Sequence, residues 1–181
     1  VHKAVLPQEE LRRELEEAGV ELGYEEIQIM QDPDFRGSQK AEDIDLVLLR
    51  VTDLGFIPRS SMMDNLGEGF WSGTLKEMRR DLSFAPRSPT LEKIYSLAEK
   101  FGLELCPPEV APYFLLEYAD QLDPNFGCYV GMKPSGSPDD QHILRIGHRR
   151  DGLSSLHFSS VHPKEELLLK QQILFCIPRK R

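Results

Sequence analysis

The chain has 181 residues, of which 40% are apolar and 29% are charged, and its net charge is −8. This length and composition predict a single soluble domain, residues 1–181, without a membrane span, because no apolar run approaches the ~20 residues that a bilayer requires. The acidic excess lies in residues 1–48, so the molecule as a whole lacks the cationic face that binding to nucleic-acid phosphates requires.

The first elements in chain order are predicted to be a helix, a strand, a loop and a second strand. Residues 7–19 have apolar side chains at helical spacing and end in Gly19, which suits a left-handed helix cap. YEEIQIM at 24–30 predicts a short strand, and the stretch 31–43, which contains proline and glycine, predicts a polar loop. IDLVLLRV at 44–51 is aliphatic at successive positions, which predicts a buried strand in the centre of a sheet.

Residues 57–88 are the least regular part of the chain, and we expect an insertion-like loop in which TLKEMRRDL could form a short helix. The large apolar side chains of this loop are Met62, Met63, Phe70 and Trp71. They are candidates for a binding surface, because a few aromatic anchors often dominate protein interfaces. The alternative is that they pack the loop onto the core.

The clearest helix of the sequence spans residues 88–102, where apolar side chains recur every three or four positions and Gly102 ends the pattern. After it the apolar residues alternate, and five strands are predicted, at 113–119, 127–133, 142–148, 153–161 and 172–178. We therefore expect an α+β protein in which a mixed helix and strand N-terminal half is followed by an antiparallel β meander.

The turn sequence RRDG fixes the register of the hairpin formed by strands 142–148 and 153–161. A three-residue loop with glycine at the bulge position pairs Ile146 with Leu156, and Leu144 with Phe158, so that all four face one side. A two-residue loop would put Arg145 on that apolar face, and we reject it for this reason.

Four of the five histidines lie in this region, and the register keeps them apart. His142 and His148 are six residues apart on one strand, which corresponds to ~20 Å, whereas zinc ligands lie within ~2.3 Å of one ion. His157 faces the other side, beside Arg145. We therefore predict no metal site and no cofactor. A serine partner for His148 or His157 stays open, although a Ser-His pair without a placed acid is weak support for a triad.

The three cysteines, Cys106, Cys128 and Cys176, lie in apolar, strand-like stretches and form no CxxC pair. They are predicted to be buried free thiols in a reducing compartment rather than a disulfide or a metal site. The N-terminal residues lack the basic start and apolar middle of a signal peptide, so a cytoplasmic location is expected.

Glu109, which follows two prolines in an apolar stretch, has two interpretations. A carboxylate among apolar side chains can have a raised pKa and act as an acid. This predicts one alternative function, a hydrolase-like enzyme that uses Glu109 with His148, His157 or a cysteine. The other interpretation is an exposed acid in a loop.

Arg145, Arg149 and Arg150 form a basic patch with the C-terminal Arg-Lys-Arg, which predicts a second alternative, weak nucleic-acid contact through this region. A solvated hairpin tip explains the same charges. The sequence contains no phosphate-binding loop, dinucleotide fingerprint, HExxH motif or nucleophile elbow.

The segment GLELCPPEV at 102–110, with the flanking LEKIYSLAEKF and APYFLLEYADQ, resembles a group of uncharacterised bacterial proteins. IDLVLLRVTDLGF, CYVGMKP and ILFCIPRKR are similar to other parts of that group, while residues 57–88 depart from it. The resemblance implies a bacterial origin and one folded unit from about residue 44 onwards, and it implies no catalytic residue.

These features together favour a small cytoplasmic binding module of unknown ligand, with another protein as its partner. The 57–88 loop is the expected contact surface, because no convergent set of catalytic residues is recognisable in the sequence.

Overall fold

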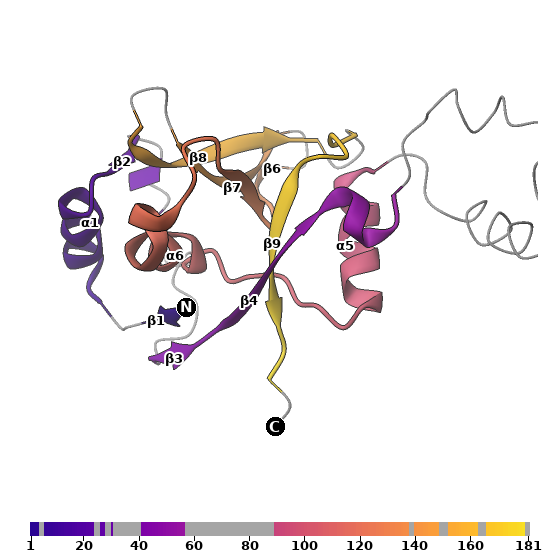
Figure 1. The fold of residues 1–181 in the computed structure, drawn as a ribbon, viewed down its shortest axis with the longest axis horizontal. Helices are drawn as coiled ribbons and strands as arrows, with labels where there is room; N and C mark the ends of the chain where they lie inside the picture. The colour runs from indigo at the N-terminus through magenta and orange to yellow at the C-terminus, as the bar shows by residue number, and fades with distance from the viewer. Residues whose placement is uncertain are drawn as a thin grey trace, which may run out of the picture.

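The structure is a computed structural model that describes residues 1–3, 6–23, 26–27, 30, 41–56, 89–137, 140–148, 152–162 and 166–179 (Figure 1). Its helices are α1 (Gln8–Glu17), α5 (Leu91–Lys100) and α6 (Val110–Tyr118), with 3-10 turns η2 (Val51–Leu54) and η4 (Ala119–Gln121). Its strands are β1 (His2–Lys3), β2 (Val20–Leu22), β3 (Glu42–Asp43), β4 (Asp45–Arg50), β5 (Gly127–Val130), β6 (Ser135–Ser137), β7 (Asp140–His148), β8 (Ser154–Val161) and β9 (Gln172–Ile177).

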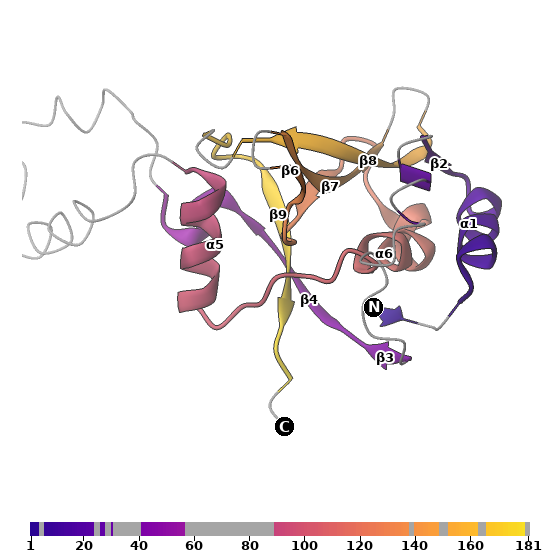
Figure 2. The same cartoon turned by 180° about the vertical axis from the view of Figure 1, so that it is seen from behind.

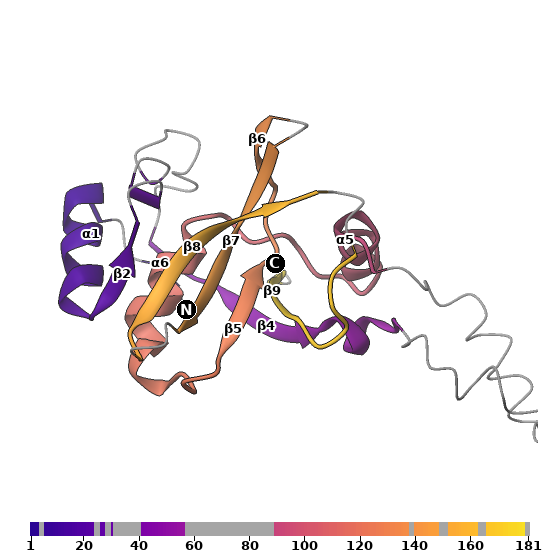
Figure 3. The same cartoon turned by 90° about the horizontal axis from the view of Figure 1, so that it is seen from above.

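One seven-stranded mixed sheet organises the described residues. Its strand order is β2-β8-β7-β5-β9-β4, with β6 paired to β7, while β1 and β3 form a separate two-stranded sheet. The sheet is strongly twisted, so that β7 and β8 cross the direction of β4 and β9 (Figures 1 and 3). The α+β class is confirmed. The predicted meander is not, because β5 and β9 are parallel neighbours and β2 and β4 join the same sheet.

The two faces of the sheet carry separate apolar clusters. On β9, Leu174 and Cys176 belong to the cluster shared with α1 and α6, whereas Ile173 and Phe175 belong to the cluster shared with α5. This alternation follows from the period of two in a strand. Helix α5 therefore packs on the opposite face from α6, and Figures 1 and 2 show the two helices on either side of β4 and β9.

The predicted hairpin register is confirmed. Ile146 pairs with Leu156, and Leu144 pairs with Phe158, along β7 and β8. Gly152 has φ +84°, the left-handed backbone expected at the bulge position of this turn. Among the residues that the structure describes, none of the helices has the length and apolar content that a bilayer crossing needs.

Both predicted glycine caps are confirmed. Gly19 and Gly102 follow α1 and α5 with φ +73° and +75°. At the end of α5 the N–H of Gly102 donates to the Glu99 carbonyl and the N–H of Leu103 donates to the Ala98 carbonyl, at 2.9 and 3.0 Å. This pair of bonds is a Schellman motif, which turns the chain sharply out of the helix. It directs residues 103–106 back along β9.

The strand predicted at 113–119 is wrong, because residues 113–118 belong to helix α6 and Ala119 begins η4. Five of the nine α6 residues are buried, and the helix lies against the sheet and α1, so it needs no polar face. A short apolar run of this kind cannot be told from a buried strand by periodicity. Pro112, in the first turn, is the residue that favours a helix start.

Two predictions in the N-terminal third are also wrong. Glu26, Ile27 and Met30 have helical backbone, so the described residues of 24–30 do not form the predicted strand. The buried Glu26 carboxylate accepts the N–H of Phe158 at 2.8 Å and so replaces a strand partner beyond the end of β2. The strand predicted at 44–51 exists as β4, but it lies at the end of the strand order rather than in its centre.

Candidate functional site

The whole of the predicted binding surface, the 57–88 loop with Met62, Met63, Phe70 and Trp71, lies outside the described residues. Two residues of the predicted basic patch, Arg149 and Arg150, also lie outside them. Arg145 is described, is exposed on β7 and pairs with His157 on β8, as predicted.

The histidines of the hairpin do not activate Ser154 or Ser155 in this structure. His148 pairs with Ser154 across the strands, but Ser154 Oγ donates to the Ala119 carbonyl at 3.4 Å, and the Nδ1 of His148 lies 3.2 Å from the Gly152 carbonyl oxygen. Ser155 Oγ donates to a backbone carbonyl of β7. A nucleophilic serine has to give its proton to a base, and these hydroxyl protons are given to carbonyls instead.

The same register separates the imidazoles along the hairpin. His142 pairs with Ser160 near one end of β7, while His148 occupies the other end. Within the described part of the chain, no group of three or more histidine, cysteine, aspartate and glutamate side chains is arranged to hold a metal ion.

Glu109 is buried at the start of α6, so its interpretation as an exposed loop acid is wrong. Its carboxylate acts electrostatically on the Cys176 thiol and on the Tyr113 hydroxyl. Burial is the main cause that raises the pKa of Tyr113, and the negative charge of Glu109 adds to it. Glu109 thus acts on a cysteine electrostatically, whereas the enzymatic alternative requires hydrogen-bond reach and stays a prediction.

Cys106 and Cys176 form a pair of thiols whose sulfur atoms lie 3.3 Å apart. Backbone pairing holds them in place, because Glu104 and Cys176 exchange N–H···O bonds of 2.9 and 3.0 Å. The N–H of Cys106 then donates to the Gly131 carbonyl at 2.6 Å. Residues 104–106 thus continue alongside β9 where β5 ends.

The two thiols of this pair are electrostatically unequal. The S–H of Cys176 points to the sulfur of Cys106. The interaction between the two thiols holds the pKa of Cys176 below the usual value of a thiol and raises the pKa of Cys106. Burial and the carboxylates Glu104 and Glu109 oppose the effect at Cys176. Only 6% of Cys176 is exposed, so a bulky acyl substrate does not reach it in this conformation.

A groove of about 450 Å³ lies beside the C-terminal half of α5, and we call it the α5 groove. Its lining comes from the last turns of α5 and from the segment that follows the Schellman turn: Tyr95, Ser96, Ala98, Glu99, Leu103, Glu104 and Leu105. The volume falls within the range of known ligand pockets. Tyr95 is fixed in the groove wall because its hydroxyl donates to the Met132 carbonyl at 2.9 Å.

Large apolar side chains are exposed around the α5 groove. Phe101 is 63% exposed, Leu105 41% and Ile177 44%. Glu104 pairs directly with Cys176, so these two side chains point to the same face of the sheet. Leu105 and Ile177 each follow one member of this pair, and side chains alternate along a strand, so Leu105 and Ile177 point to the opposite face.

Two carboxylates complete the α5 groove. Glu99 and Glu104 are exposed, and neither forms an ion pair with another residue of the described ranges. The groove therefore combines an apolar floor with a negatively charged rim.

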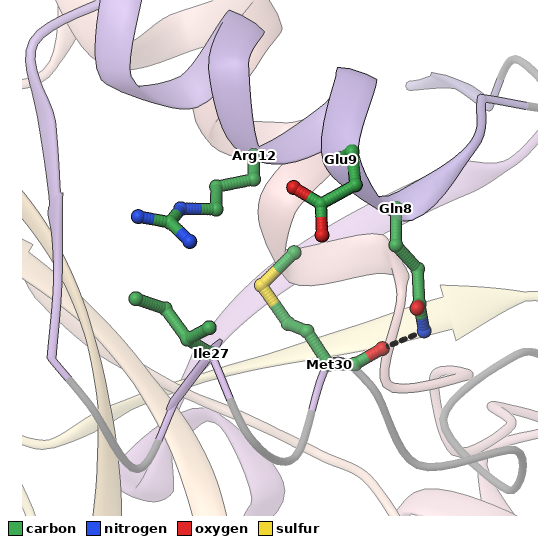
Figure 4. A pocket seen from close by; sticks show the side chains of 5 residues that line it. All are labelled: Gln8, Glu9, Arg12, Ile27 and Met30. Atoms are coloured by element: carbon green, nitrogen blue, oxygen red, sulfur yellow. Dashed lines mark hydrogen bonds between the residues drawn. The ribbon is translucent and has the colours of Figure 1, made fainter.

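A second, smaller cavity lies between α1 and the segment that contains Glu26, and Figure 4 shows its lining: Gln8, Glu9, Arg12, Ile27 and Met30. Its volume of about 10 Å³ holds at most one water molecule. The Gln8 amide donates to the Met30 carbonyl across it. This cavity is a packing feature and is too small for a ligand.

The sequence predicted burial of the three cysteines but neither their pairing nor the α5 groove. The contact between Cys106 and Cys176 depends on the β-bridge between Glu104 and Cys176, which are more than 70 positions apart in the sequence. The sequence also predicts a meander for the strand that carries Cys176, and a meander does not bring residue 104 beside it. The one local signal for the groove was Gly102, which ends α5 and reverses the chain.

Comparison of the chain with protein-family models, with curated proteins and with solved structures found no match in any of the three. The resemblance of residues 102–110 to uncharacterised bacterial proteins stays a prediction.

Proposed function

We propose that the chain is a binding module and that the α5 groove takes an extended segment of a partner protein in which basic residues flank an apolar side chain. The observation that carries the proposal is an open groove of about 450 Å³ lined in part by exposed Leu105, together with exposed Phe101 and Ile177 at the ends of α5 and β9. Exposed apolar patches of this kind mark interaction sites when a polar rim surrounds them.

The negative charge at the rim of the α5 groove favours a partner segment that carries positive charge. Glu99 and Glu104 offer two carboxylates that are unpaired among the described residues. A lysine or arginine of the partner would approach them favourably, whereas an acidic segment would be repelled. An apolar side chain next to that basic residue would cover Leu105, which contributes both to the groove lining and to the exposed surface.

Selection from a random peptide library displayed on phage tests this proposal. We expect the bound peptides to be enriched in lysine or arginine next to leucine, isoleucine or phenylalanine. A synthetic peptide of the selected sequence should bind Glu99→Lys and Glu104→Lys about tenfold more weakly, because reversing a rim charge replaces an attraction by a repulsion.

Glu17→Lys is the matched control, because Glu17 is an exposed helical glutamate on α1, away from the α5 groove. It should bind the peptide as the unchanged protein does. Selection of acidic peptides, no enrichment at all, or equal weakening in all three variants would count against the proposal.

A further inference from the structure

The thiol pair Cys106 and Cys176 points to a second property of the chain, which does not depend on the proposed binding function. The sulfur atoms are 3.3 Å apart, whereas a disulfide has an S–S distance of about 2.05 Å. Backbone bonds between Glu104 and Cys176 hold the two segments side by side, so the sulfur atoms have to approach each other by roughly 1 Å to form the bond.

The surroundings of the pair favour reaction between the two thiols over reaction with other groups. Both side chains are buried, so bulky reagents are excluded while a molecule as small as hydrogen peroxide can enter by local opening. Cys128 is also buried, but no thiol contact of this kind holds it, and burial raises its pKa to about 12.

We propose that Cys106 and Cys176 are a reversible oxidation site at which a peroxide converts the two thiols into one intramolecular disulfide. The Cys176 thiolate attacks a peroxide oxygen, the O–O bond breaks, and a sulfenic acid forms while the released hydroxide takes up a proton to give water. Cys106, which gives its proton to solvent, attacks the Cys176 sulfur and expels the second hydroxide, which also becomes water. Two thiols and one hydrogen peroxide thus yield one disulfide and two waters, and a small dithiol reverses the reaction.

The bridge would tie the segment that lines the α5 groove to β9 by a covalent bond. Residues 106 and 176 are 70 positions apart, so the bridge closes a long loop of the unfolded chain. A crosslink over a loop of this length should raise the Tm of the chain by roughly 10 °C. The same bond would restrict Glu104 and Leu105, which precede Cys106.

The experiment exposes the reduced full-length chain to hydrogen peroxide, unfolds it in denaturant, and counts the free thiols with a maleimide reagent. We expect the three thiols to fall to one, with a mass loss of two hydrogen atoms, a Cys106–Cys176 peptide crosslink and full reversal by dithiothreitol. The same peroxide treatment of the unfolded chain shows that the dose is sufficient to oxidise thiols.

Matched variants separate the pair from ordinary thiol oxidation. Cys128→Ser should still lose both of its remaining thiols to a disulfide. Neither Cys106→Ser nor Cys176→Ser should form an intramolecular disulfide: Cys176→Ser should keep two free thiols, whereas Cys106→Ser should gain the mass of one oxygen atom at Cys176. If a serine variant does not fold, Cys106→Ala or Cys176→Ala replaces it, and the crosslink map of the unchanged chain decides by itself. Persistence of all three thiols, a crosslink through Cys128, or dimers linked between chains would overturn the proposal.

Discussion

Gly131→Ala should destabilise the protein, because residue 131 lies where three segments meet. Gly131 follows β5, its N–H donates to the Leu174 carbonyl at 2.8 Å, and its carbonyl accepts the N–H of Cys106. A methyl group at this position would lie 2.7 Å from a ring carbon of Phe175 and 3.0 Å from the Leu174 oxygen. Both distances are shorter than ordinary van der Waals contact.

The size of this destabilisation depends on whether the atoms next to the added methyl group can move away. The Phe175 ring is fully buried and packs edge-on against Tyr95, with ring centroids 6.2 Å apart, so it cannot retreat without displacing the wall of the α5 groove. Overpacking a core by one methyl group costs about 1–3 kcal/mol. Replacing glycine by alanine also restricts the unfolded chain, which offsets about 0.4–1 kcal/mol. We therefore expect a net loss of about 1–2 kcal/mol in the free energy of unfolding.

Urea denaturation followed by circular dichroism measures this loss, and an unchanged dependence on urea shows that the same surface is exposed on unfolding. Gly147→Ala is the matched control, because Gly147 is also a buried glycine of the sheet, yet its added methyl group would lie 3.4 Å from the nearest atom, the Phe126 oxygen. This control should change the stability by less than about 1 kcal/mol. Equal effects of the two substitutions would refute the close approach of β5 and β9 at residue 131.

Two further predictions concern charged groups that hold the edges of the fold. Glu26→Ala should cost about 1–3 kcal/mol, because it leaves the Phe158 N–H without its acceptor, while Glu26→Gln should cost less; urea denaturation of both variants tests this, and equal losses would contradict it. The hydrogen bond from Arg179 holds the pKa of Asp45 below its ordinary value of 3.8, so the contribution of this pair to stability is present above that value and is lost as the pH falls below it. Asp45→Asn should therefore lower the Tm at about pH 7, and the difference should shrink as the pH falls below 3.8. A pH-independent difference would exclude this linkage.

The sequence was sufficient to predict the helix ends and the hairpin register, because interactions between neighbouring residues determine them. Gly19 and Gly102 end their helices because only glycine enters the left-handed region without a steric penalty. The hairpin register followed from keeping Arg145 off the apolar face, and the pairing of Ile146 with Leu156 confirms it. These features depend on residues within a few positions of one another.

Features that depend on distant residues were not predictable in the same way. Helix α6 is apolar on most of its surface because it packs against both α1 and the sheet. These contacts arise only in the tertiary fold, so the local sequence does not reveal them. The Glu26 carboxylate serves as a strand partner for a residue 132 positions away. The pair of Cys106 and Cys176 likewise depends on a bridge that no local pattern encodes.

Backbone amide chemical shifts, recorded by NMR while a selected basic and apolar peptide is added, test the proposed binding function most directly. The account predicts that the largest shift changes cluster in residues 95–105, which line the α5 groove. Changes that cluster instead at the β7–β8 hairpin around Arg145, with residues 95–105 unaffected, would contradict it.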